Sequence, residues 1–478
     1  LGDAVRTPAP AAESPAAPPP SIVSTDKTTI SNAQVVIERP GAEDTVKLLE
    51  RTPGVSMYDA GGVSRLPVIH GMADDRVKVL TGGVNITSAC ANHMNPPLSY
   101  TGSNNVGKIE VYSGVVPVSK GGDSIGGTII AEPRAPEFAP QKVAGTGEQA
   151  EESVSASVVS ANNQTFAPAP LFYKAGQLKH GPNNKLLVSG EFSSFYRSNN
   201  TGLSDSVTLN EATDHYAMLY NGSWSRANNY KAGGNDPTVF STNFISENHS
   251  GTFAYQNEGH LISLRAAYEN IPYQGFVNQR MDMTGNQGYQ AEAKYQGDTK
   301  WGKVDGRAYW ATVAHKMGFL NDKQPNNMPM DTNGLDYGYS LKLDHRVNDE
   351  HLWRVGSEYH GFRLNDYWQP IAPNGGIMTA QDSTTFMPPS TSIYPMTMIM
   401  MAPFTQWNIR NGMRNRLSHY GEVESNWTGK VSTLFGVRND MVFSNAGQAA
   451  AYDPNNPALM PMLVAGGRWR PGLMQNPD

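Results

Sequence analysis

Long segments in the C-terminal two thirds of the chain alternate between apolar and polar residues. Over residues 289–296, Tyr or Ala occupies every odd position and Gln, Glu or Lys every even position, and residues 262–269 and 335–344 follow nearly the same pattern. A period of two sustained over about ten residues, with aromatic residues on the apolar face, is typical of strands in a transmembrane β-barrel. On periodicity alone, a large soluble β-sandwich or propeller is the alternative.

The connections between these segments alternate between short and long. Short connections cover residues 257–259, 297–303 and 347–350, and long ones cover residues 270–284, 318–334 and 364–412. Outer-membrane barrels have tight turns at the periplasmic end and large loops at the external end, whereas a sandwich gives no reason for such alternation. The sequence therefore predicts an all-β transmembrane barrel.

Composition excludes several other classes of protein. The sequence has no run of about 18 apolar residues, which excludes a transmembrane helix. The net charge is −6 and the basic residues form no stripe, so no nucleic acid is expected as a partner. The single cysteine, Cys90, rules out a disulfide within the chain.

The residues before the barrel fall into two parts. Residues 1–33 begin with an Ala/Pro-rich stretch and predict an extended segment. Residues 34–135 mix short apolar runs with glycine-rich turns, which predicts an α+β domain with a helix over residues 45–51 and a strand and turn over residues 77–84. Residues 136–478 then form the barrel.

The number of strands is small for a plugged transporter. We count roughly 11 to 14 candidate strands in the barrel region, whereas a plugged transporter barrel has 22. Either the barrel is small or the sequence stops short of the natural end of the chain. We expect the second, with at least a dozen antiparallel strands in an incomplete barrel.

Three motifs in the N-terminal domain carry a resemblance to a known family. They are LLERTPGVSM at residues 48–57, VIHGMADDRVKVLTGGV at residues 68–84 and IEVYSGVVPVSKGGDSIGGTII at residues 109–130. In this order, and followed by a barrel pattern, they resemble the plug motifs of TonB-dependent outer-membrane receptors. The chain departs from those motifs at four positions, where His70 and Ser113 replace Arg, Gly82 replaces Asp and Lys120 replaces Tyr.

The resemblance implies an architecture and a mechanism. Residues 34–135 would form a plug in the lumen of a 22-stranded barrel, surrounded by lipid in the outer membrane of a Gram-negative bacterium. Substrate would bind on the external side, and the TonB energising complex would pull on the N-terminal segment. Residues 21–25 are the candidate TonB box, with Ile22 and Val23 as contacts, because TonB grips such a segment by adding it to a sheet. The family consists of transporters, so no catalytic residue is expected.

Methionine is frequent and clusters in the segments predicted as external loops. The chain has 20 methionines, and five pairs have the spacing Met-x-Met: 281 and 283, 328 and 330, 396 and 398, 398 and 400, and 460 and 462. Capture of a soft metal by thioethers explains this clustering, and irregular packing between loops is the alternative. The candidate additional metal ligands are Met328, Met330, Met396, Met398 and Met400.

Cys90 lies in the segment SACANHMNPPLSY, which follows the second motif. A free thiol in an oxidising envelope is a liability unless it has a function. Met94 follows with the spacing Cys-x-x-x-Met, so that a single turn puts both sulfurs on one side, and His93 is an additional candidate ligand. The alternative for a lone cysteine is a small buried hydrophobic residue.

The strand that begins near residue 304 supplies partners for Cys90. Asp305 and Arg307 share one face, which must line the lumen, and the period of two places His315 and Met317 on that face. The strand follows a short connection and precedes a long one, so His315 and Met317 lie at its external end. We therefore expect them to meet Cys90 and Met94 in one four-ligand site.

Thiolate, thioether and imidazole ligands select Cu(I) over hard cations. The Cys-x-x-x-Met and His-x-Met motifs are similar to those of TonB-dependent copper receptors of the OprC/NosA type, which implies that all four residues bind copper and that the chain imports it. The alternatives are a TonB-dependent receptor for another cargo, such as an iron chelate or cobalamin, an enzyme with Cys90 as nucleophile beside His93, and a purely structural barrel.

Overall fold

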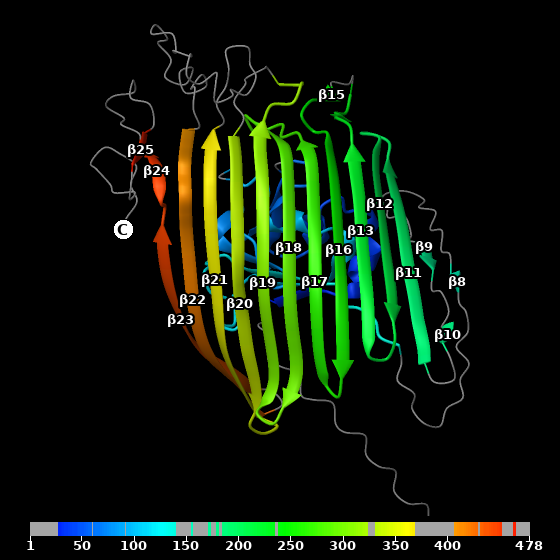
Figure 1. Cartoon of the computed structure of the whole chain (residues 1–478), viewed down its shortest axis with the longest axis vertical. Coiled ribbons are helices and arrows are strands. Elements are labelled where there is room, and N and C mark those ends of the chain that lie inside the picture. Colours follow the sequence, from blue (N-terminus) through cyan, green and yellow to red (C-terminus); the bar gives the residue numbers. More distant parts are fainter. Residues whose placement is uncertain are drawn as a thin grey trace, which may run out of the picture.

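The computed structural model describes residues 27–59, 61–90, 92–139, 154–155, 171–173, 178–180, 184–234, 238–323, 330–368, 406–428, 431–451 and 462–464. It consists of an N-terminal domain, described over residues 27–139 except residues 60 and 91, and a large curved sheet, here called the wall. Figure 1 shows the N-terminal domain, in blue and cyan, behind the wall, in green to orange. None of the described helices is long and apolar enough to cross a bilayer.

The N-terminal domain is built around a five-stranded sheet with the order β1-β6-β7-β4-β5. β4 and β7 run parallel, and the other neighbours run antiparallel. The strands of the domain are β1 (Lys27–Ile30), β2 (Val55–Tyr58), β3 (Leu66–Ile69), β4 (Val77–Thr81), β5 (Val84–Asn85), β6 (Val106–Tyr112) and β7 (Gly127–Pro133). Its helical segments are α1 (Asn32–Glu38) and the 3₁₀ turns η1 (Arg39–Gly41), η2 (Thr45–Leu49), η3 (Asp74–Arg76), η4 (Pro97–Tyr100) and η5 (Ser103–Asn105). The predicted α+β character of this domain is confirmed.

Local sequence explains where the helical segments begin. α1 starts at a capping box, in which Gln34 N donates to the Ser31 hydroxyl at 3.4 Å and Ser31 N donates to Gln34 Oε1 at 2.8 Å. The helix predicted over residues 45–51 is found as the shorter 3₁₀ helix η2. Asp44 caps the start of η2 and Pro53 follows soon after its end, which leaves room for little more than one turn.

The core of the N-terminal domain is apolar. One cluster of buried side chains joins α1 and η2 to the five-stranded sheet and includes Val35, Val46, Leu48, Leu49, Ile69, Val79, Ile109, Val111 and Ile129. Full burial of one such side chain contributes about 1.5–3 kcal/mol relative to leaving it in water. This cluster therefore holds the domain together as a unit of its own.

The wall is an antiparallel sheet of 16 strands among the described residues, which confirms the predicted dozen or more. Its long strands are β11 (Asn184–Arg197), β12 (Gly202–Ala212), β13 (Tyr216–Ala227), β16 (Phe244–Asn257), β17 (His260–Gln274), β18 (Asp282–Thr299), β19 (Gly302–Gly318), β20 (Met330–Arg346), β21 (His351–Trp368), β22 (Gln406–Thr428) and β23 (Val431–Asn445). Its short strands are β8 (Val154–Ser155), β9 (Leu171–Tyr173), β10 (Leu178–His180), β24 (Gln448–Ala451) and β25 (Met462–Val464), and β14 (Tyr230–Lys231) and β15 (Thr238–Val239) form a separate hairpin. The strand order runs from β25 to β8, and these two end strands do not pair with each other, so the described sheet is open.

The two faces of the wall reverse the distribution of apolar and polar side chains found in a soluble protein. On β17, Leu264 is 55% exposed on the outer face, whereas the neighbouring Arg265 is only 7% exposed on the inner face. The same contrast separates outward Tyr289 from inward Gln290, and Trp310 from Tyr309. A sheet that is apolar where it is open and polar where another domain covers it fits a barrel wall between lipid and plug, so the predicted fold class is confirmed.

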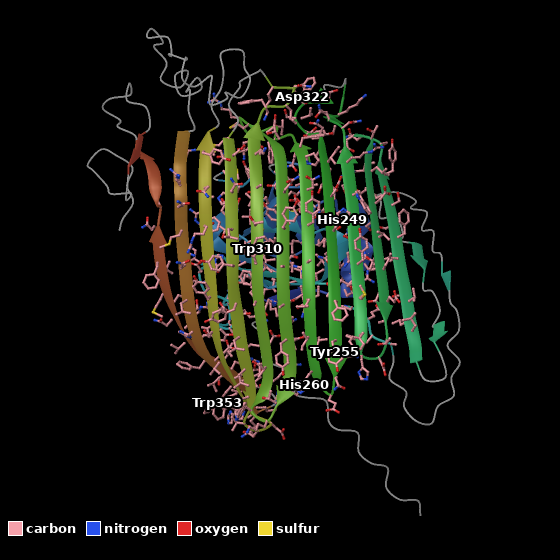
Figure 2. The ribbon with its side chains drawn as sticks, viewed as in Figure 1. His249, Tyr255, His260, Trp310, Asp322 and Trp353 are labelled. Carbon is pink, nitrogen blue, oxygen red and sulfur yellow. The ribbon has the colours of Figure 1, made fainter. Side chains whose placement is uncertain are left out.

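The two ends of the wall differ in their connections. Residues 258–259, 300–301 and 347–350 are short links at one end, where Figure 2 shows His260 and Trp353. Residues 275–281 form a longer link at the opposite end, where Figure 2 also shows Asp322 in the segment that follows β19. The short and the long connections, which alternate along the chain as predicted, therefore lie at opposite ends of the wall. These ends are here called the short-turn end and the long-loop end.

Close contact between the two parts depends on the turn between β4 and β5. Gly82 and Gly83 have φ values of +66° and +78°, a region that residues with side chains rarely adopt. A Cβ atom on Gly83 would also collide with the guanidinium group of Arg307 on β19. The two glycines thus allow β5, and the segment that leads from it to Cys90, to lie against the wall.

Candidate metal centre

β19 directs His315 and Met317 into the space between the wall and the N-terminal domain. Along this strand the odd-numbered residues from Tyr309 to Met317 are buried, whereas the even-numbered Trp310 is 44% exposed. His315 is 0% exposed and Met317 is 1% exposed. The structure therefore gives both residues the inward orientation predicted from the period of two, near the long-loop end of the strand.

The register of the wall extends this pair into two rows of side chains. Met317 pairs with Met283 on β18 and with Met330 on β20, and these three form the thioether row. His315 pairs with Asn286 on β18 and with Thr332 on β20, and Thr332 pairs with Asp366 on β21. These four residues form the polar row, one pleat closer to the short-turn end. Inward neighbours on adjacent strands have Cβ atoms about 4.5–5.5 Å apart, so each row is a continuous band.

The N-terminal domain brings Cys90 to the thioether row. Cys90 O accepts a hydrogen bond from His93 N at 2.9 Å, which closes a tight turn, and the Cys90 Sγ atom lies 3.4 Å from the Met317 Sδ atom. Two sulfur ligands bonded to one ion at about 2.3 Å, with a tetrahedral angle between them, lie about 3.8 Å apart. The two sulfurs are therefore already near the separation that a shared metal ion requires.

Met94 and three further methionines join the same cluster. The buried apolar cluster around Cys90 contains Met94 from the N-terminal domain and, from the wall, Met281, Met283, Met317 and Met330. Met281 lies in the link before β18, as predicted, whereas Met283 and Met330 lie in strands. The prediction that the three residues are exposed is wrong, because each is at most 8% exposed. β18 and β20 are longer than expected at this end, so these residues lie at or beside strand ends and turn inward.

The surroundings of Cys90 keep its thiol protonated in the absence of a metal. Burial raises the pKa of the Cys90 thiol to about 11, and the charge of Asp366 acts in the same direction. The backbone amides of Met94 and Asn92 oppose this shift by donating hydrogen bonds to the sulfur. An ion that binds at Cys90 must therefore displace a proton, after which the two amides stabilise the thiolate.

His315 has one nitrogen engaged and one available. Its Nδ1 atom lies 3.0 Å from Asn286 Oδ1, whereas its Nε2 atom is buried without a hydrogen-bond partner among the described residues. A buried nitrogen without a partner is unfavourable by about 1–3 kcal/mol, so an ion that accepts its lone pair would remove that penalty. Imidazole is a good ligand for copper and zinc.

The other predicted ligands are distributed differently. His93 is half-buried with φ +50°, and its Nδ1 atom lies 3.6 Å from Asp74 Oδ1 rather than in the sulfur cluster. The predicted positions Met328, Met396, Met398, Met400, Ile22 and Val23 lie outside the described residues. Within the described ranges, no three His, Cys, Asp or Glu side chains gather into a metal site. The thioethers are thus needed to complete any ligand set here.

Sequence reasoning missed the amides beside the candidate ligands. Asn95 Oδ1 accepts from Cys90 N at 3.3 Å, and Asn95 Nδ2 donates to Asn286 Oδ1 at 3.3 Å. The position of Asn95, next to Met94, was the available signal. Asn286 is 191 residues farther along the chain, and only the docking of the two parts brings it close.

Comparisons with known proteins agree with this architecture. Residues 22–128 match the family model of the TonB-dependent Receptor Plug Domain. A search of curated protein sequences finds no match. Among solved structures, the copper transporter OprC is similar, with a TM-score of 0.65 and 16% identity over 92% of this chain and 57% of that chain.

Two further solved structures have the same fold and are named for other cargoes. The FrpB iron transporter from Neisseria meningitidis has a TM-score of 0.58 and 14% identity, over 88% of this chain and 61% of that one. The Serratia marcescens hemophore receptor HasR, solved as a double mutant with its hemophore HasA and heme, has a TM-score of 0.59 and 12% identity, over 89% and 53%. This chain therefore spans little more than half the length of these proteins, and at such identities the likeness establishes the fold.

The plug model covers the domain that supplies Cys90 and Met94, and the solved structures share the wall that supplies His315 and Met317. TonB-dependent receptors are transport proteins rather than enzymes, in agreement with the sequence-based expectation. Residues 22–128 therefore form a TonB-dependent receptor plug domain, the wall has the fold of the solved outer-membrane transporters, and such receptors reside in the outer membrane of Gram-negative bacteria.

Proposed function

We propose that this receptor captures copper between plug and wall and imports it into the periplasm. The ligands are Cys90 and Met94 from the plug and His315 and Met317 from β19. The observation that carries the proposal is the 3.4 Å separation between the Cys90 and Met317 sulfurs, which come from two different domains. The buried and unpartnered Nε2 atom of His315, two residues from Met317, supports a fourth ligand of a different kind.

The ligand set favours Cu(I) among biological metals. One thiolate, two thioethers and one imidazole are soft or borderline donors, whereas Mg²⁺ and Ca²⁺ bind oxygen. Structural zinc sites are built from Cys, His, Asp or Glu, and thioether is not among their usual ligands. The thiolate supplies one negative charge, which matches the single positive charge of Cu(I).

Burial favours a bare ion over a bulky chelate. All four candidate ligands are at most 1% exposed, and the surrounding cluster is filled by further methionine and phenylalanine side chains. An iron chelate, heme or cobalamin needs a large external cavity, whereas a single ion needs only a small space between existing donors. This contrast supports copper over the cargoes named for FrpB and HasR.

The origin of the ligands suggests a route of release. TonB pulls on the segment that precedes β1, and the predicted contacts in that segment are Ile22 and Val23. Movement of the plug would separate Cys90 and Met94 from His315 and Met317 and thereby halve the coordination. The ion would then be free to pass toward the short-turn end, which faces the periplasm in this family.

Metal analysis of the purified protein tests the proposal. We expect the full chain in detergent, loaded with Cu(I) under anaerobic conditions and desalted, to retain about one copper ion per molecule. Cys90→Ala should lose high-affinity copper, because it removes the only charged ligand, whereas Met94→Ala should weaken binding. Met218→Ala, at a lipid-facing methionine that is 61% exposed, is the matched control and should bind like wild type.

Two outcomes would contradict the proposal. One is equal retention of copper by wild type and Cys90→Ala. The other is saturable binding of a ferric chelate, heme or cobalamin by a protein that retains no copper, which would assign the receptor to one of those cargoes.

A further inference from the structure

The side chains that connect Cys90 to His315 form a chain of hydrogen bonds with a fixed direction. Asn95, from the plug, and Asn286, from β18, lie between the two candidate ligands and are each 0% exposed. An amide side chain has a donor end and an acceptor end, and the correct orientation is set by its neighbours. Here the backbone N–H group of Cys90 determines the orientation of the first amide, Asn95.

The direction begins at the backbone of Cys90. Cys90 N can only donate, so the Asn95 atom that lies 3.3 Å from it must be the oxygen Oδ1. The other end of Asn95 is then the donor Nδ2, which lies 2.6 Å from Tyr100 Oη and 3.3 Å from Asn286 Oδ1. Asn286 Oδ1 is thereby identified as an acceptor from the plug side.

The wall fixes Asn286 in the same orientation. Asn286 Nδ2 donates a hydrogen bond of 2.9 Å to the side-chain oxygen Oε2 of Glu269 on β17. Asn286 Oδ1 therefore faces His315 Nδ1, at 3.0 Å, as an acceptor. Because an acceptor faces it, His315 Nδ1 must carry the proton.

This arrangement decides which nitrogen of His315 is available. A neutral imidazole has one protonated nitrogen, so a proton on Nδ1 leaves the lone pair on Nε2. The Nε2 atom is the one that is buried without a partner among the described residues. Histidine ligands commonly donate their second ring N–H to a neighbouring acceptor, which fixes the tautomer and raises the basicity of the ligating nitrogen.

We propose that Asn286 is a positioning residue for metal capture, and that Asn95 and Glu269 orient it so that His315 presents Nε2 to the sulfur cluster. This inference rests on the proposed function of the same site. It adds a second role for the plug. The plug supplies two ligands of its own, and it also helps to orient His315, a ligand from the wall, because Asn95 holds Asn286 from the plug side. Plug movement would then remove two ligands and loosen the orientation of a third.

Substitution of Asn286 by leucine tests the proposal in the full chain. Asn286→Leu removes the acceptor of the His315 proton while keeping a side chain of similar size. We expect the affinity for Cu(I), measured by competition with a Cu(I) chelator, to fall about 10- to 100-fold, as for other groups that orient a ligand. X-ray absorption of the copper-loaded variant should show loss of the imidazole contribution and retention of the sulfur contribution.

A double substitution separates positioning from a general structural role. If Asn286 acts through His315, then His315→Ala and the double variant His315→Ala/Asn286→Leu should bind Cu(I) equally well. Asn210→Leu is the matched control, because Asn210 is another buried wall asparagine that bonds to the plug, at Glu137, on the distant strand β12. It should leave Cu(I) affinity unchanged.

The outcomes also distinguish this inference from the proposed function. Wild-type affinity in Asn286→Leu, with Cys90→Ala still deficient, would overturn the inference and leave the copper site in place. Additive losses in the double variant would likewise overturn it. If wild type and Cys90→Ala do not differ, the proposed function itself fails.

Discussion

The interior of the plug and the contact between plug and wall are held together by different interactions. The interior is an apolar cluster that includes Val35, Leu49 and Ile109. The contact with the wall is largely polar: Thr87 bonds to Asp336, Asp123 pairs with Arg414 and Arg416, Asn104 Nδ2 donates to Gly222 O, and Arg39 pairs with Glu191. When such contacts open, polar groups can form hydrogen bonds with water instead, whereas exposed apolar groups gain no equivalent interaction from water.

This difference suggests how a plug can move without unfolding. Apolar contacts inside the plug keep its sheet intact under tension, and polar contacts at its surface are the ones that can be replaced. Two buried apolar clusters that span both parts are exceptions. One joins Ile86 of the plug to Val313 of the wall, and the other is the sulfur cluster, which includes Val63 and Met94 from the plug. A metal at this point would add a further link between plug and wall until the plug is pulled.

The largest expected effect comes from the interior of the plug. Leu49 is 0% exposed, and Leu49→Ala should destabilise the plug by about 2–5 kcal/mol, because it leaves a cavity in the apolar cluster. Hydrogen exchange should accelerate throughout β4, β6 and β7. Ile37→Ala, at a position that is 63% exposed on α1, is the matched control and should change little. An effect confined to residues near Leu49 would contradict a single cooperative core.

A smaller and more local effect is expected at the contact with the wall. Asp336 accepts hydrogen bonds from Thr87 N at 3.0 Å and Thr87 Oγ1 at 2.9 Å, and it pairs with His360 Nε2 at 2.8 Å. Asp336→Ala should lower the free energy of local opening by about 2–3 kcal/mol, because buried partners lose their acceptor.

Hydrogen exchange measures this effect directly. Protection should fall in residues 87–95 and remain unchanged in β6 and β7. Asp349→Ala, at an exposed position in the turn between β20 and β21, is the control. Loss of protection across the whole plug would mean that wall contacts, rather than the apolar cluster, maintain its fold.

The smallest expected effect concerns the edge strand β1. Burial by itself would raise the pKa of Glu110, but Lys27, Lys120 and Lys108 together lower that pKa from 4.5 to about 2. Because the pKa is lower in the folded state, the carboxylate stabilises the fold above about pH 4.5, and this contribution is lost as the pH falls toward 2.

Glu110→Gln should mimic the acid state at neutral pH. The ion pair between Lys27 Nζ and Glu110 Oε1, at 3.0 Å, joins β1 to β6 and is partly exposed, so its loss should destabilise β1 by about 1 kcal/mol or less. Protection factors of β1 amides should fall, while β6–β7 pairing persists. Glu50→Gln, at an exposed position, serves as the control. Unchanged protection of β1 would mean that its backbone pairing alone holds it.

Much of the fold could be predicted from the sequence, because the alternation of apolar and polar residues directly reflects the geometry of a β-strand. A period of two assigns every residue of a strand to one of two faces, and this was sufficient to turn His315 and Met317 inward. The apolar run and the two glycines of residues 77–84 likewise predicted a strand followed by a turn. The helix predicted over residues 45–51 ends earlier, at Leu49, because its length is limited by the cap at Asp44 and by the residues that follow it.

Strand ends limited the prediction of the site. Met281, Met283 and Met330 lie where β18 and β20 begin, and a period of two does not reveal how far a strand continues into a long loop. Once those strands are paired with β19, the register determines that Met283 and Met330 flank Met317. Their place in the cluster follows from hydrogen bonding between strands and is absent from any single segment.

The sequence by itself determined which residue types could form a soft-metal site and which face of β19 would carry two of them. Three features were decided by the tertiary structure alone. They are the position along β19 at which Cys90 meets Met317, the thioether and polar rows beside them, and the hydrogen bond from Asn95 to Asn286. The physical reason is that local periodicity sets directions within one segment. Contacts such as Cys90 to Met317, 227 residues apart, depend on how two separately folded parts dock.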